Sequence, residues 1–179
     1  MKTLILGGIK SGKSRLAEKL AQDLGVPVTL VATATADDDE MKNRIRKHQR
    51  SRPDNWNTIE EPVAIAAVLE QLSGNTSCVV LDCLTLWLTN LLMLSDHGKL
   101  EHETSNFLIA AQAFPGTLII VSNETSMGIV PVGDLTRRFC DESGLLHQAL
   151  ADLCESVILC VAGLPHSIKG NIITTDALN

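Results

Sequence analysis

The sequence predicts an α/β fold in which a mostly parallel central sheet is covered by helices on both faces. Apolar runs with strand character alternate with helical patterns, as in parallel sheets. The runs are continuous rather than alternating, which indicates strands buried on both faces. They occupy residues 3–6, 28–32, 78–81, 117–122 and 157–161. The length of 179 residues and the 45% hydrophobic content suit a single domain.

Helical patterns fill the intervals between these runs. We expect helices at residues 13–24, 37–50, 62–72, 84–94, 101–113 and 134–154. In such sheets, ligands bind at the carboxyl ends of the strands. The last stretch, residues 165–179, alternates in polarity near 171–175 and forms either an extra strand or a loose tail. We therefore expect one domain over residues 1–170, followed by a C-terminal tail at 171–179.

Composition narrows the class of protein. The net charge of −6 gives no reason to expect a nucleic-acid or membrane-surface partner. No apolar stretch reaches the roughly 20 residues of a membrane span, and the N-terminal apolar run is too short for a signal peptide. We therefore expect a cytoplasmic protein. The five cysteines include no C-x-x-C pair and are interpreted as small buried hydrophobic residues, not as a disulfide framework or zinc site.

A complete phosphate-binding loop (P-loop) follows the first predicted strand. It reads Gly7, Gly8, Ile9, Lys10, Ser11, Gly12, Lys13 and Ser14, and a helical pattern follows. The glycines allow successive N–H groups to face an anion at the positive end of the helix dipole. Lys13 would reach the β- and γ-phosphates, and Ser14 would bind Mg²⁺. The alternative is an ordinary glycine-rich turn. The loop predicts a P-loop NTPase-type three-layer fold and a bound nucleoside triphosphate, with the loop itself exposed to solvent.

An acid at the end of another strand would complete the Mg²⁺ site. Asp82 closes the apolar run at 78–81 and is placed to hold Mg²⁺ through water. Alternatively, its carboxylate caps the helix that begins near Leu84.

A basic segment surrounds one histidine. Residues 42–52 carry six of the 15 basic residues and no acid, which leaves nine basic and 21 acidic residues elsewhere. Met41, Ile45 and His48 share one face of the expected helix. Neighbouring cations disfavour the imidazolium form, so His48 could attack phosphorus as a nucleophile. A solvated basic face, a structural histidine and a general base are the alternatives.

Further motifs follow in a specific order. They are Ala32-Thr33-Ala34, Asp38-Asp39-Glu40-Met41, Arg44-Ile45 with His48, Arg52-Pro53 with Trp56, Asp82-Cys83-Leu84-Thr85, Thr89-Asn90-Leu91-Leu92, Ser122-Asn123-Glu124, Met127-Gly128-Ile129-Val130-Pro131, and Arg138-Phe139 with Asp141 and Gly144. Together with the P-loop, this series resembles the bifunctional adenosylcobinamide kinase / adenosylcobinamide-phosphate guanylyltransferase family of cobalamin biosynthesis. The resemblance extends to about Lys169.

The resemblance implies two reactions. The hydroxyl of the aminopropanol arm of adenosylcobinamide takes the γ-phosphoryl group of ATP or GTP. GTP then transfers GMP to adenosylcobinamide phosphate, through a phosphoramidate on His48, giving adenosylcobinamide-GDP and pyrophosphate. The resemblance also implies a homo-oligomer, with a trimer as the form suggested by analogy. Implied nucleotide contacts are the P-loop, Ala32, Thr33, Ala34, Gln49, Arg50, Ser51, Arg52, Glu60 and Asp82.

Glu60 and three departures from the family pattern need separate mention. Glu60 lies in a segment interpreted as a loop, where it either accepts hydrogen bonds from guanine or favours the start of the next helix. Asp82 stands where the family often has glutamate. Ser126 replaces a usual glycine, and His147 replaces a common asparagine.

Two other functions remain open from the sequence. A single-function P-loop kinase for a small molecule would use Lys13, Ser14 and Asp82 and leave His48 without a role. A GTP-dependent regulatory switch would consume no cobinamide.

Overall fold

The computed structural model describes residues 1–35, 55–74, 78–96 and 98–170. In these ranges the strands are β1 (Lys2–Gly7), β2 (Val28–Ala32), β3 (Asn57–Glu60), β4 (Cys78–Asp82), β5 (Thr117–Val121), β6 (Ser156–Val161) and β7 (Leu164–Lys169). The helices are α1 (Lys13–Asp23), α3 (Ile65–Leu72), α4 (Leu84–Leu92), α5 (Gly98–Ala113) and α6 (Asp134–Leu153). The predicted helix at 37–50 and the tail at 171–179 lie outside the described residues.

One seven-stranded sheet organises the protein, in the order β3-β2-β4-β5-β1-β6-β7. All neighbouring pairs are parallel except β6 and β7, which are antiparallel. Strand β5 therefore lies between β1, which ends at the P-loop, and β4, which ends at Asp82. This placement brings three carboxyl ends together at the middle of one sheet edge.

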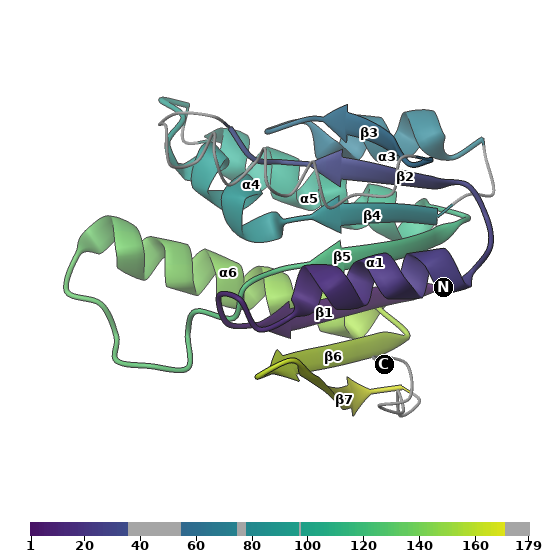
Figure 1. The fold of residues 1–179 in the computed structure, drawn as a ribbon. Helices are drawn as coiled ribbons and strands as arrows, with labels where there is room; N and C mark the ends of the chain where they lie inside the picture. The colour runs from purple at the N-terminus through teal and green to yellow at the C-terminus, as the bar shows by residue number, and fades with distance from the viewer. Residues whose placement is uncertain (36–54, 75–77, 97, 171–179) are drawn as a thin grey trace.

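Helices cover both faces of the sheet, as predicted (Figure 1). Helix α1 packs on one face, in a core that includes Leu16, Ile5 and Ile119. Helices α3 to α6 pack on the other face, where Trp87 and Phe107 are fully buried. Successive residues of each central strand alternate between the two cores, because side chains along a strand point to opposite faces. The three-layer α/β arrangement of the P-loop NTPase type is confirmed.

Two edge strands differ from the sequence prediction: one was interpreted as a loop, and the other lies largely in the stretch left open as a strand or a tail. The segment Asn57–Glu60, interpreted as a loop, is the edge strand β3, which pairs with β2 from Asn57↔Thr29 to Glu60↔Ala32. It has no apolar run because three of its four residues are exposed. The antiparallel edge strand β7 follows a two-residue turn at Ala162 and Gly163. Most of its residues are also exposed.

Candidate functional site

The P-loop connects β1 to the first turn of α1. Gly7 has no room for a side chain, since an added Cβ would lie 2.4 Å from the Cys160 carbonyl oxygen. Gly12 has φ 99°, a left-handed conformation that favours glycine. The β6–β7 turn supports the loop, because the Gly163 N–H donates to the Ser11 carbonyl oxygen at 3.0 Å. The conformation of the P-loop therefore depends on contacts with the neighbouring strand β6 and with the β6–β7 turn.

Lys13 is buried, contrary to the expectation of an exposed loop. Gly8, Ile9 and Lys10 are exposed, but the Lys13 side chain donates to the Gly8 carbonyl oxygen at 2.6 Å and to Ser11 Oγ at 3.5 Å. Burial lowers the pKa of the Lys13 ammonium, and attraction by Asp82 opposes that shift. The P-loop amine and the β4 carboxylate therefore lie close enough to interact, although neither is near the other in sequence.

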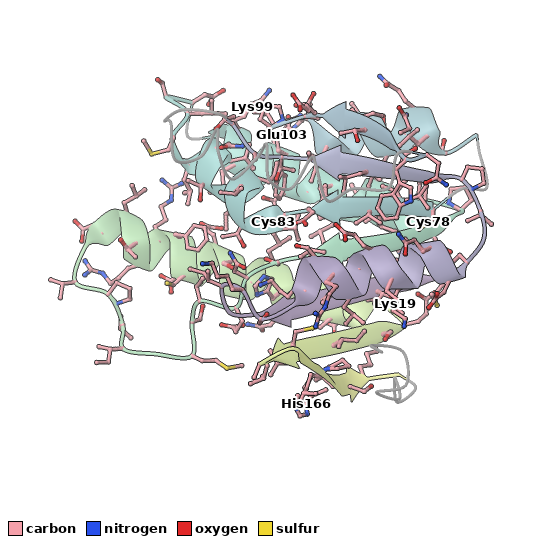
Figure 2. The ribbon with its side chains drawn as sticks, in the orientation of Figure 1. Lys19, Cys78, Cys83, Lys99, Glu103 and His166 are labelled. Carbon is pink, nitrogen blue, oxygen red and sulfur yellow. The ribbon has the colours of Figure 1, made fainter. Side chains whose placement is uncertain are left out.

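Asp82 is the last residue of β4 and is half-buried. It does not cap the following helix: the N-cap of α4 is Cys83, without a side-chain hydrogen bond. Figure 2 labels Cys83 at this end of β4 and Cys78 at the other. Burial raises the pKa of the Cys83 thiol to about 11, so this thiol stays protonated near neutral pH.

The chemistry of this edge fits a magnesium ion that accompanies a triphosphate. Mg²⁺ is usually held by one or two protein oxygen ligands, with water and substrate phosphates completing the shell. The Ser14 hydroxyl in the first turn of α1 and the Asp82 carboxylate supply such oxygens. Within the described ranges, no group of three or more His, Cys, Asp and Glu side chains gathers as a metal site. The donor set is therefore suited to a shared protein–phosphate site.

Thr33 and Asn90 join the ends of β2 and β4. Thr33 is fully buried; its hydroxyl donates to the Cys83 carbonyl oxygen at 2.7 Å and accepts the Cys83 N–H at 3.0 Å. The Asn90 amide donates to the carbonyl oxygens of Thr33 and Pro62, at 2.8 and 3.0 Å. The predicted contact segment Ala32, Thr33 and Ala34 is thus held beside Asp82 by hydrogen bonds.

Glu60 and Glu61 have separate positions at the end of β3. Glu60 is the exposed last residue of the strand, four strands from β1 in the sheet order. Glu61 Oε1 accepts the N–H groups of Val63 and Ala64, at 2.9 and 2.8 Å, just before α3. The neighbouring Glu61, not Glu60, is therefore the carboxylate at the helix entry.

The structure does not bring every predicted residue together. Gly7 to Ser14, Ala32 to Ala34, Glu60 and Asp82 all lie at the carboxyl edge of the sheet. His48, Gln49, Arg50, Ser51 and Arg52 lie outside the described residues.

Four polar side chains outside the predicted set meet beside the P-loop. His147 Nε2 lies 2.8 Å from Ser122 Oγ, and its Nδ1 lies 3.8 Å from Glu124 Oε2. Thr85 Oγ1 lies 3.5 Å from Ser122 Oγ and accepts the Asn123 N–H at 2.8 Å. The sequence carried a signal, because Ser122, Asn123 and Glu124 follow a buried strand just as Asp82 does. Ser126, in place of a glycine, has no positive φ, so that departure is compatible with the loop.

Comparisons with known proteins place this chain in a family. The family described as "Cobinamide kinase / cobinamide phosphate guanyltransferase" matches residues 3–168. The chain belongs to this family. It is 52% identical over 170 residues to the bifunctional adenosylcobalamin biosynthesis protein CobP of Pseudomonas aeruginosa. The matched region covers 95% of this chain and 98% of that protein.

More distant relatives carry a similar description. The bifunctional adenosylcobalamin biosynthesis protein CobU of Escherichia coli is 35% identical, over 94% of this chain and all of that protein. A solved Pyrococcus horikoshii structure has a TM-score of 0.54 at 10% identity, over 98% of this chain and 88% of the other, and supports the fold alone. In the described part of the chain, no helix is both long and apolar enough to span a membrane.

Proposed function

We propose that this protein phosphorylates adenosylcobinamide with ATP or GTP and then transfers GMP from GTP to adenosylcobinamide phosphate. The juxtaposition of Lys13 and Asp82 at the carboxyl edge of the sheet carries the proposal, together with the family match over residues 3–168. We further propose that residues 1–170 act as one catalytic domain, in the cytoplasm, as a homo-oligomer that is a trimer by analogy with the family.

In the first reaction, the P-loop holds the β- and γ-phosphates of the donor. The hydroxyl oxygen of the aminopropanol arm bonds to the γ-phosphorus, and the bond from that phosphorus to the bridging oxygen breaks, releasing ADP or GDP. Lys13 and the loop N–H groups stabilise the charge that develops on the phosphate oxygens. Ser14 and Asp82 would hold Mg²⁺, which neutralises phosphate charge when bound.

In the second reaction, a nitrogen of His48 bonds to the α-phosphorus of GTP, and pyrophosphate leaves. A phosphate oxygen of adenosylcobinamide phosphate then bonds to the same phosphorus and releases the histidine. This division into two displacements is covalent catalysis. We propose that Ala32, Thr33, Ala34, Glu60 and the segment Gln49 to Arg52 contact the guanine nucleotide.

The test is a labelling experiment with GTP that carries a radioactive α-phosphate. Incubation with Mg²⁺ should leave acid-labile, alkali-stable label on the protein, as expected of a phosphoramidate. His48→Ala should take up no label, whereas His102→Ala, at an exposed position on α5, should label like the wild type. Absence of label on the wild type, or label that survives His48→Ala, would contradict the proposed intermediate.

A further inference from the structure

The position of Glu124 follows from the strand order. Strand β5 is hydrogen-bonded to β1 on one side and to β4 on the other, and Val121 is level with both Ile5 and Asp82. Neighbouring strands lie about 4.8 Å apart. The chain that leaves β5 therefore emerges one strand from the P-loop and one strand from Asp82.

Backbone hydrogen bonds hold the segment after β5 against β1 and against the first residue of the P-loop. The Ser122 N–H donates to the Ile5 carbonyl oxygen, and the Glu124 N–H donates to the Gly7 carbonyl oxygen, each at 3.0 Å. Gly7 is the first residue of the P-loop. Glu124 is thus anchored against the loop that we propose to hold the transferred phosphoryl group.

Side chains around Glu124 restrict its carboxylate. Oε1 accepts the Ser126 N–H at 2.6 Å, while Oε2 faces His147 Nδ1 at 3.8 Å. Of the residues that the structure describes, none donates a hydrogen bond to Oε2 within ordinary distance. The glutamate side chain is 16% exposed. Oε1 is therefore held by a hydrogen bond, whereas Oε2, on a partly exposed side chain, has lone pairs that can accept a proton.

Among the described residues, the other acids at this sheet edge are less suited to accept a proton from an acceptor hydroxyl. Asp82 is the proposed metal ligand, and Glu61 is engaged by the N–H groups that precede α3. Glu60 ends the edge strand β3, which is separated from β1 by three strands. His147 is buried, and burial lowers its imidazole pKa, so near neutral pH it places no full positive charge against Glu124.

We propose that Glu124 is the general base of the kinase reaction, an inference that rests on the proposed function. Oε2 takes the proton of the aminopropanol hydroxyl as its oxygen bonds to the γ-phosphorus and the bond to the leaving diphosphate breaks. The protonated glutamic acid returns the proton to solvent after product release. General-base catalysis typically contributes about 10²–10⁴-fold to a rate. The GMP transfer needs no such base, because its acceptor is a phosphate that is already ionised.

The two reactions of one protein supply the test, with Glu124→Gln as the variant. Glutamine keeps the length and an oxygen that can accept the Ser126 N–H, but it cannot take the proton. The kinase reaction, measured with adenosylcobinamide and ATP, should slow by about 10²–10⁴-fold in kcat. GMP transfer, measured with adenosylcobinamide phosphate and GTP, should continue at the wild-type rate. Glu70→Gln, at an exposed position on α3, is the control that should change neither rate.

Each result has a defined meaning. A kinase rate that survives Glu124→Gln overturns the role of Glu124 alone. Equal loss of both reactions also overturns the general-base role. The Glu124 carboxylate would then serve only to hold the loop at Ser126. A wild-type protein that carries out neither reaction overturns the proposed function and this inference with it. Retained GMP transfer in the variant also shows that it is folded.

Discussion

The carboxyl edge of the sheet has two sides that are built differently. The side that we propose to hold the phosphates (the phosphate side), formed by the ends of β1, β5 and β4, lies in the middle of the sheet and carries Lys13, Asp82 and Glu124. The side that we propose to hold the nucleoside (the nucleoside side), formed by the ends of β2 and β3, reaches the edge strand and carries Glu60, which is exposed. Groups that stabilise a transition state must be held rigidly. A group that selects between guanine and adenine can lie at the edge of the sheet, where a substitution disturbs the fold less.

The largest effect should come from the phosphate side. Lys13→Ala removes the cation that we propose to contact the β- and γ-phosphates, and both reactions depend on that contact. We expect both rates to fall by at least about 10²-fold. Steady-state assays of each half-reaction measure this, and circular dichroism checks the fold. Loss of only one activity would show that the two reactions do not share the P-loop.

A smaller and more selective effect should come from the nucleoside side. Glu60→Gln removes a charged acceptor proposed for guanine, so we expect the KM for GTP to rise about tenfold, equivalent to roughly 1.4 kcal/mol. The KM for ATP in the kinase reaction should not change. Competition between the two nucleotides measures the difference.

Glu61→Ala is the matched comparison for Glu60. It removes the acceptor for two N–H groups before α3 and should lower the free energy of unfolding by about 1 kcal/mol, without altering nucleotide choice. If it changed nucleotide choice as Glu60→Gln does, the two carboxylates would not have separate roles.

The sequence predicts the phosphate side better than the nucleoside side. The P-loop from Gly7 and the carboxylate of Asp82 stand at the ends of buried strands, where local pattern and tertiary position agree. Strand β3 was missed because its register is imposed by β2 and not by apolar residues of its own. Strand β7 could not be distinguished from a tail because it pairs on one side only and most of its residues are exposed, so it has no buried apolar run.

Glu124 shows a different limit of sequence reasoning. Its motif was recognised, but its position between the P-loop and Asp82 depends on the order of the strands. Strand order is a property of the whole sheet, and no local pattern encodes it. The contact between His147 in α6 and Ser122, the residue after β5, spans 25 positions and depends on tertiary packing in the same way.

The smallest effect concerns His147, beside the phosphate side, and how the free energy of unfolding of the protein depends on pH. Burial depresses the pKa of His147, which Glu124 partly opposes, so the unfolded chain binds more protons than the folded one below about pH 6.5. Wild-type stability should therefore fall as the pH drops through that value. His147→Asn, which carries the residue common in the family, should lose less stability there. Urea unfolding between about pH 5 and pH 8 measures this. Parallel curves for the two proteins would contradict the buried, neutral histidine.

The central claim is that one P-loop supports two reactions that use different residues. His48→Ala tests it most directly, with both half-reactions measured on the same preparation. We predict that the variant converts adenosylcobinamide to its phosphate at the wild-type rate but forms no adenosylcobinamide-GDP from the phosphate and GTP. Loss of both reactions, or continued GMP transfer, would contradict the account.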